Sequence, residues 1–140
     1  MSLRTLNTFL ATAGVLFILY IGVSYVLTPE TTAPGFGLPN RPSGDGDGFL
    51  ILKGIRDITS GLVLGILLLT GHRRALGWVL LMEAVTPFGD MIDVLAHHGS
   101  TAAAFGVHGL TSALIVVTGL LTLRETGKAR KAGEAVARPA

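Results

Sequence analysis

The chain of 140 residues has no cysteine and little charge. The absence of cysteine excludes disulfide bonds, a thiolate nucleophile, and zinc or iron–sulfur sites held by thiolates. Only 14% of the residues are charged, whereas 49% are hydrophobic and the mean hydropathy is +0.61. This composition is too apolar for an ordinary soluble domain of this length and predicts a single integral membrane unit.

Several motifs of known chemistry are also missing. The chain has no G-x-S-x-G turn, no P-loop and no H-E-x-x-H helix, and the Gly44–Gly48 stretch lacks the other ligands of an EF-hand. We therefore expect no bound metal and no redox or nucleotide cofactor. The formal charge of +2 does not indicate nucleic-acid binding, because the positive residues cluster at the ends of apolar runs. The expected partner is the lipid bilayer.

Four apolar runs are each long enough to cross a bilayer, which takes roughly 20 residues. We predict an all-α, integral membrane four-helix bundle with up-down-up-down topology. A cleaved signal peptide in place of the first span, or a soluble helical bundle, are the alternatives. The predicted spans are residues 6–28, 49–70, 75–98 and 101–123, with a Pro- and Gly-rich external loop at 29–48 and a basic tail at 126–140.

Positive charge sets the expected orientation. Arg4, the Arg73–Arg74 turn and the tail lie on one side of a four-span topology, and the positive-inside rule assigns that side to the cytoplasm. The long first loop carries three acidic residues against one arginine, and the third loop has no Lys or Arg. We therefore expect a multi-pass protein of the cell membrane with both termini in the cytoplasm.

Ionisable residues inside the apolar runs are the main indication of a site. A charge at membrane depth costs a few kcal/mol, so it seldom persists without a role. On each predicted helix these residues recur at helical spacings and form one stripe, which should face other helices rather than lipid. The residues concerned are Lys53, Arg56, Asp57, Glu83, Asp90, Asp93 and His108.

The helical rise indicates which of these residues meet. At about 1.5 Å per residue, four of them fall at one depth in the outer leaflet: Arg56, Asp57, Asp90 and His108. Glu83 lies deeper, near the midplane. Two cations and four carboxyls cannot all be buried in their ionised forms, so one group must change its protonation state or a cation or basic ligand must bind.

A carboxyl held neutral, or a histidine that titrates near neutrality, is what general acid–base chemistry requires. The same groups have two alternative interpretations, as interhelical staples alone, or as a metal site that also involves His97. The assigned residues are Asp57, Asp90 and His108 for proton transfer, with Arg56, Lys53, Glu83 and Asp93 for ligand binding. The alternative metal site would use Asp90, Asp93, His97 and His108.

Three further features bear on the shape of the site. Pro87 should kink the third span and open room beside Asp90. Phe36, with the Gly-Leu-Pro sequence after it, is positioned to fold back as a lid over the outer opening. Gly61 and Gly65 form a G-x-x-x-G motif, which predicts a close helix contact. That contact lies either within the chain or between the copies of a homo-oligomer.

The second predicted span resembles the signature of a known family. Lys53-Gly54-Ile55-Arg56-Asp57 is similar to the G-[IV]-R-D motif of small four-helix membrane proteins of unknown function, whose general plan is DoxX-like. The similarity covers most of residues 8–123. It implies a shared polar set, Arg56, Asp57, Asp90 and His108. Some members of that family are encoded near secondary-metabolite genes, and the resemblance therefore implies a small lipophilic substrate.

These observations support three functional hypotheses. The first is a membrane-embedded site that binds a small lipophilic ligand and converts it by isomerisation or cyclisation without a redox cofactor. The second is a small proton- or cation-coupled carrier, in which Glu83 near the midplane completes a relay. The third is an accessory subunit of a membrane complex, whose interior charges are purely structural.

Overall fold

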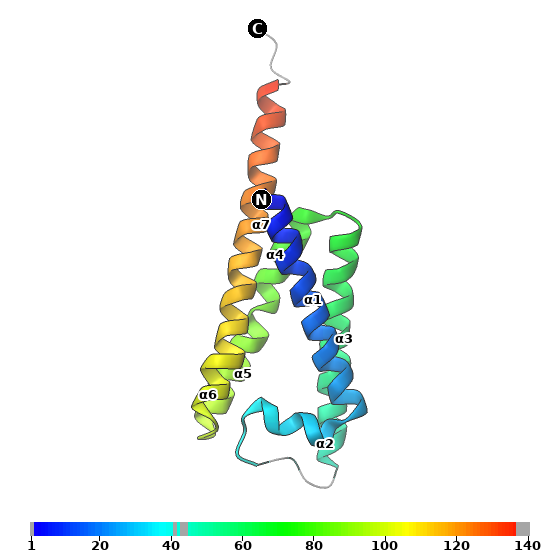
Figure 1. Cartoon of the computed structure of the whole chain (residues 1–140), viewed down its shortest axis with the longest axis vertical. Helices are drawn as coiled ribbons and strands as arrows, with labels where there is room; N and C mark the ends of the chain where they lie inside the picture. Colours follow the sequence, from blue (N-terminus) through cyan, green and yellow to red (C-terminus); the bar gives the residue numbers. More distant parts are fainter. Residues whose placement is uncertain (1, 41, 43–44, 137–140) are drawn as a thin grey trace.

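A computed structural model of the chain describes residues 2–40, 42 and 45–136, with side chains up to residue 129 (Figure 1). The predicted loop charge at Arg41 and the tail charges at Arg130, Lys131 and Arg138 lie outside the described side chains. The described residues are all-helical and contain no strand. The elements are α1 (Leu3–Leu27), α2 (Pro29–Thr32), the 3-10 helix η1 (Ala33–Phe36), α3 (Gly46–Leu69), α4 (Arg73–Glu83), α5 (Val85–Ala96), α6 (Thr101–Ala103), the π-helix η2 (Ala104–Gly109) and α7 (Leu110–Val136).

The helices lie close to the predicted apolar runs, with three differences. The expected loop at 29–48 contains α2 and η1, and α3 begins at Gly46. The third run is divided at Ala84 into α4 and α5, and the basic tail continues α7 as a helix to Val136. Two helical stretches, Leu3–Leu27 and Thr101–Ala129, are long and apolar enough to cross a membrane. The prediction of an all-α protein is therefore confirmed.

The division at Ala84 has a local cause. Pro87 has no backbone N–H, so the carbonyl of Glu83 loses its helical donor. The helix bends there, and the Ser112 hydroxyl of α7 donates a 2.9 Å hydrogen bond to the Ala84 carbonyl. Ser112 itself is buried. Ser112 thus attaches α7 to the bend, one residue after the carbonyl that lost its helical donor.

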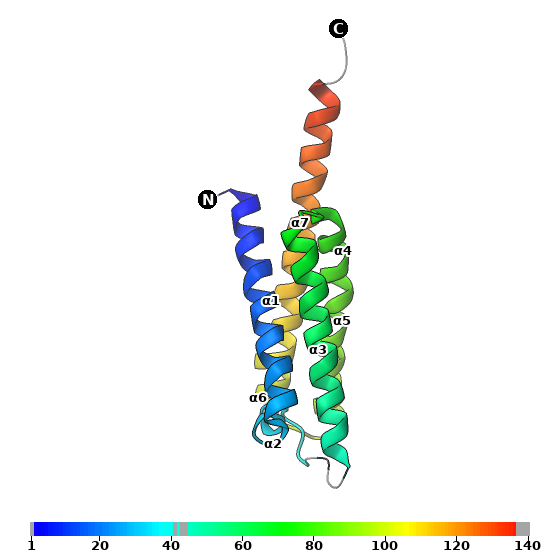
Figure 2. The ribbon, with the colours of Figure 1, turned by 90° about the vertical axis from the view of Figure 1, so that its right-hand side faces the viewer.

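Two glycine contacts join the helices in pairs. A Cβ atom on Gly54 of α3 would lie 2.6 Å from the Gly22 carbonyl oxygen of α1, so only glycine permits this approach. Gly77 of α4 and Gly119 of α7 meet in the same way, with a Cβ on Gly119 only 3.0 Å from the Gly77 oxygen. The molecule therefore consists of a pair α1–α3 and a pair α4/α5–α7 (Figures 1 and 2).

The two pairs meet at one end and separate toward the other. α1 packs on α7, and α3 on α4, near the turn that precedes Arg73, and we call this the Arg73 end. The main apolar core lies here, formed by Ala11, Leu64, Leu76 and Leu80. α1 and α7 diverge toward the opposite end, where α2 and η1 lie, and we call this the Phe36 end (Figure 1).

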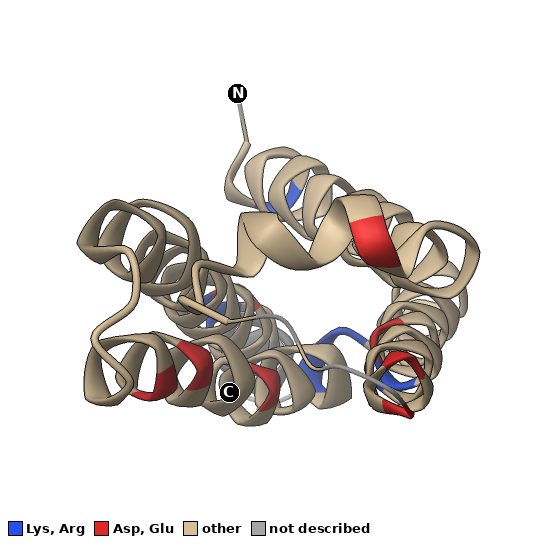
Figure 3. Ribbon diagram, turned by 90° about the horizontal axis from the view of Figure 1, so that it is seen from below, with Lys and Arg blue, Asp and Glu red and all other residues tan. Residues whose placement is uncertain are grey.

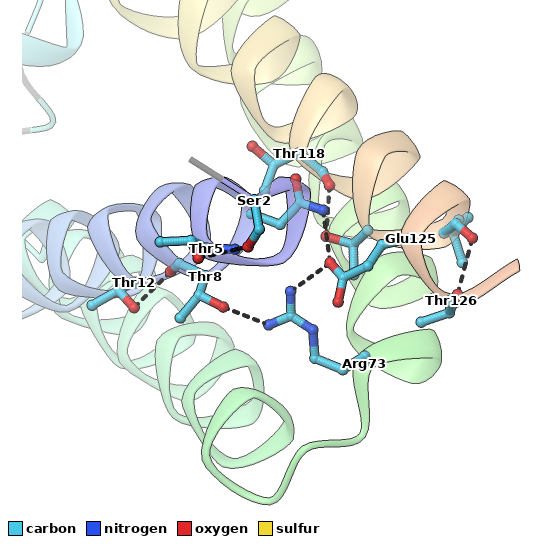
Figure 4. A network of polar contacts seen from close by, with 11 residues as sticks. Ser2, Thr5, Thr8, Thr12, Arg73, Thr118, Glu125 and Thr126 are labelled. Carbon is cyan, nitrogen blue, oxygen red and sulfur yellow. Dashed lines mark hydrogen bonds and ion pairs between the residues drawn. The ribbon is translucent and has the colours of Figure 1, made fainter. Parts of the chain in front are cut away.

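A polar network closes the Arg73 end (Figure 4). The Glu125 carboxylate accepts hydrogen bonds of 2.8 Å from both Asn7 of α1 and the Arg73 guanidinium, which also donates to Thr8 at 3.1 Å. Burial raises the pKa of Glu125, but the hydrogen bonds from Arg73 and Asn7 outweigh this effect and hold the pKa below its ordinary value. Glu125 lies beyond the predicted end of the fourth span. The network fastens the two helix pairs together.

Candidate functional site

A cavity of about 500 Å³ lies between the two helix pairs. Figure 3 looks along the helices from the Phe36 end and shows how the ribbons of the two pairs are arranged. α1 contributes lining residues from Leu10 to Tyr25, so the cavity extends along most of that helix. Its volume falls within the range typical of small-molecule sites, roughly 300–1,000 Å³.

The cavity has an apolar wall and a polar wall. The α1 wall is apolar except for the Tyr25 hydroxyl, and its lining residues recur at spacings of one helix face. Opposite it, α3 presents polar side chains at similar spacing, and α4 and α5 do the same. The polar lining residues of these helices are Lys53, Asp57, Ser60, Glu83, Thr86 and Asp90.

Lys53 and Asp57 form an ion pair on α3 at the Phe36 end of the cavity. Their Nζ and Oδ2 atoms are 2.8 Å apart, and the Asp57 side chain is only 8% exposed. The Lys53 ammonium also lies 5.0 Å from the ring centre of Tyr25 and 5.6 Å from that of Phe36. Both rings present their π-electrons to the cation, which helps to hold Lys53 at the cavity.

His108 is held from both sides. Its Nε2 atom is 2.8 Å from the Phe36 carbonyl oxygen, and because a carbonyl only accepts, Nε2 carries the proton. Nδ1 faces Asp90 Oδ2 at 3.8 Å. The two side chains therefore face each other at ion-pair distance. The π-helical turn η2 carries His108, and such turns are frequent at functional sites.

The segment after η1 covers the Phe36 end. The Phe36 ring lies 4.6 Å from the His108 ring, and the Ser100 N–H donates a 2.8 Å hydrogen bond to the Gly37 carbonyl. Gly37 has φ 99°, and a Cβ there would lie 2.5 Å from the Ala103 Cβ, so both the conformation and the packing require glycine. This fold-back lies where the sequence placed a lid.

The structure brings together five of the seven assigned residues and separates two. Lys53, Asp57, Glu83, Asp90 and His108 line the cavity. The other two, Arg56 and Asp93, do not. Arg56 is exposed on α3, because one helical residue is a turn of about 100° and it cannot face the same way as its buried neighbour in the chain.

The residues of the alternative metal site form two separate pairs. Asp93 and His97 lie 3.2 Å apart on α5, with both side chains about half-exposed or more, away from the pair of Asp90 with His108. Within the described part of the chain, no group of three or more His, Asp or Glu side chains is arranged to hold a metal ion.

The comparison with protein families adds one result. Residues 15–122 match the family described as "Domain of unknown function (DUF4267)". The chain belongs to this family. The matched region of this chain includes every polar residue that lines the cavity. The comparisons with curated proteins and with solved structures found no match.

Several residues of the site were not predicted from the sequence. Neither Tyr25 nor Thr86 was among the residues assigned from the sequence, yet both line the cavity. Thr86 lies four residues before Asp90, and this helical spacing was a signal that could have found it. The Asn7–Glu125 contact joins residues 118 apart, and no local pattern indicates it.

Proposed function

We propose that this chain spans the membrane four times, with both termini in the cytoplasm. Besides the two helical stretches that meet the criteria for a span, α3 and the α4–α5 segment each extend over about 24 residues, or about 36 Å. Large apolar side chains are exposed on all of these helices, for example Phe9, Leu62, Trp78 and Leu114. Contiguous exposed apolar surface of this kind is suited to lipid.

We further propose that the cavity binds a small lipophilic molecule that carries an oxygen function. The observation that carries this proposal is the combination of an apolar α1 wall with the charged cluster at the Phe36 end of the same cavity. Lys53, rather than the predicted Arg56, orients the ligand oxygen, because its ammonium lies at the cavity. Exposed apolar lining residues of α1 and α7, such as Phe17 and Leu110, border a route of entry from the bilayer.

The Asp90–His108 pair is suited to moving a proton on such a ligand. In an isomerisation, the Asp90 carboxylate takes a proton from carbon, and the C–H electron pair moves into the carbonyl system, whose oxygen Lys53 stabilises. The His108 imidazolium then donates a proton at another carbon, and the proton on Asp90 returns to His108. No electrons are gained or lost, so the step needs no redox cofactor. The sequence assigned proton transfer to both Asp57 and Asp90. We assign it to Asp90, because Asp57 is paired with Lys53.

The carrier hypothesis receives less support. Its relay would have to continue from Glu83 to the Arg73 end, but the polar wall ends near Ser60 and Glu83, and an apolar core that includes Leu64 and Leu80 follows. A purely structural role would not require a cavity beside the charged pairs.

Filling the cavity tests the binding proposal. Gly14 lies in the middle of the α1 lining stripe and Gly89 on the exposed face of α5, and a Cβ on either would meet nothing within 4 Å. We expect Gly14→Phe to weaken binding of a pyrene-labelled fatty acid at least tenfold in nanodiscs, whereas Gly89→Phe leaves it unchanged. Equal binding by both variants would contradict the proposal.

A further inference from the structure

The middle of the cavity carries a second set of polar side chains. They come from four elements and line the same space, and within the described part of the chain none has a side-chain hydrogen-bond or ion-pair partner. None of the four is buried, since three are half-buried and Thr86 is exposed, so their polar atoms are open to a molecule in the cavity. These side chains are therefore suited to a ligand group. The four residues, which we call the middle subsite, are Ser60, Glu83, Thr86 and Thr111.

Two helices place the middle subsite at the same distance from the charged cluster. Ser60 follows Lys53 by seven residues on α3, and Glu83 precedes Asp90 by seven residues on α4 and α5. Seven residues correspond to about 10 Å of helix. The two helices run in opposite directions, so their agreement sets the separation along the cavity at about 10 Å.

The opposite wall and the width of the cavity limit the ligand further. The α1 lining from Leu10 to Tyr25 spans 15 residues, about 22 Å. Dividing about 500 Å³ by this length gives a mean cross-section of about 23 Å². An elongated cavity of this length suits one extended hydrocarbon chain. The hydrocarbon chain of the ligand would contact α1 along its whole length, and polar groups on the other side only from the Phe36 end to Ser60 and Glu83.

The middle subsite also indicates which polar group fits. An ionised Glu83 carboxyl only accepts hydrogen bonds, whereas the Ser and Thr hydroxyls donate or accept. A ligand hydroxyl can donate to Glu83 and accept from Thr111 at once, whereas a ligand carbonyl has no proton for Glu83. A hydroxyl therefore meets both requirements with a single atom.

We propose that the cavity takes an elongated single-chain amphiphile with an oxygen function at one end, held at Lys53, and a hydroxyl about 10 Å along the chain, held at the middle subsite. This inference rests on the proposed binding function and names its ligand class. The remaining hydrocarbon extends toward Leu10 and the Arg73 end.

Two probes that differ by one hydroxyl test this inference. Octadecanoic acid and its derivative with a hydroxyl at the ninth carbon are compared as competitors of a pyrene-labelled fatty acid, with the full chain in phosphatidylcholine nanodiscs. We expect the hydroxy acid to bind about tenfold more tightly, the effect of roughly one good hydrogen bond. Glu83→Leu should abolish this preference. Asp93→Leu, which removes an exposed carboxyl outside the cavity, should retain it.

Each other outcome is decisive. Equal affinity of the two acids in the wild-type chain overturns the inference. The proposed function still stands in that case if both acids compete with the pyrene-labelled fatty acid and this competition depends on Lys53. Competition by neither acid contradicts both. If Glu83→Leu does not fold, the nearly isosteric Thr111→Val tests the middle subsite without removing a charge, and an unchanged preference in that variant overturns the inference.

Discussion

The imidazole of His108 and the backbone carbonyl of Phe36 are joined by a 2.8 Å hydrogen bond across 72 residues of chain. This bond fixes the proton on Nε2 and directs Nδ1 to Asp90. It also attaches the η1 segment to η2, which carries His108. One contact thus sets the tautomer of a neutral His108 and closes one end of the cavity.

Loss of this contact should loosen the cover of the cavity. We expect His108→Ala to expose the η1 segment, because it removes both the hydrogen bond and the ring contact with Phe36. The chain has no cysteine, so Gly35→Cys provides a unique label at the cavity lining. Its maleimide reaction should be at least several-fold faster in the His108→Ala background. The control is Asp93→Ala combined with Gly35→Cys. Equal rates in Gly35→Cys alone and in its combinations with His108→Ala and with Asp93→Ala would show that His108 does not hold the segment.

The α1–α3 crossing should tolerate no side chain at Gly54. Gly54→Ala places a Cβ 2.6 Å from a backbone oxygen of α1, so the helices must separate. We expect a loss of about 1–3 kcal/mol in the free energy of unfolding. Gly65→Ala on the same helix meets its nearest neighbour at 3.6 Å and should be neutral or slightly stabilising. Thermal unfolding in detergent distinguishes the two, and equal stability of both variants would contradict the close crossing.

Acid should weaken the network at the Arg73 end. The pKa of Glu125 in the folded chain lies below its ordinary value of 4.5, so its contribution is complete above that value and is lost as the pH falls through the folded pKa. The Tm should therefore fall more steeply below pH 4.5 in the wild-type chain than in Glu125→Gln. We expect Glu125→Gln to cost about 1–3 kcal/mol at neutral pH. Parallel acid profiles of the two proteins would refute the role of this carboxylate.

The sequence predicted the helices and part of the site for identifiable physical reasons. Apolar runs and helical spacing are local properties, so the all-α class and the face that carries Asp57 could be derived. The same spacing argument wrongly grouped Arg56 with Asp57, because a stripe of residues three and four apart spans more than one face of a helix. Their positions relative to the cavity depend on how closely α1 packs on α3, which Gly22 and Gly54 decide.

Contacts between distant segments could not be derived in this way. Glu125 lies in what the sequence describes as the start of a polar tail, and its partner Asn7 is one polar residue in an apolar helix. The break at Ala84 follows from Pro87, but its stabilisation by Ser112 depends on the packing of α7. Whether Gly61 of the G-x-x-x-G motif contacts its own chain was equally open. In the structure this glycine packs against Leu19 of α1, within the chain.

The most direct measurement compares Lys53→Met with Arg56→Met. Both remove one cation from α3, but only Lys53 lines the cavity. With the full chain in phosphatidylcholine nanodiscs, we expect Lys53→Met to weaken binding of a pyrene-labelled fatty acid at least tenfold, Lys53→Arg to restore much of it, and Arg56→Met to bind like the wild-type chain. Thermal unfolding of each variant separates loss of binding from loss of fold. Unchanged binding by a folded Lys53→Met, or a larger loss in Arg56→Met, would contradict the assignment of this cavity as the binding site.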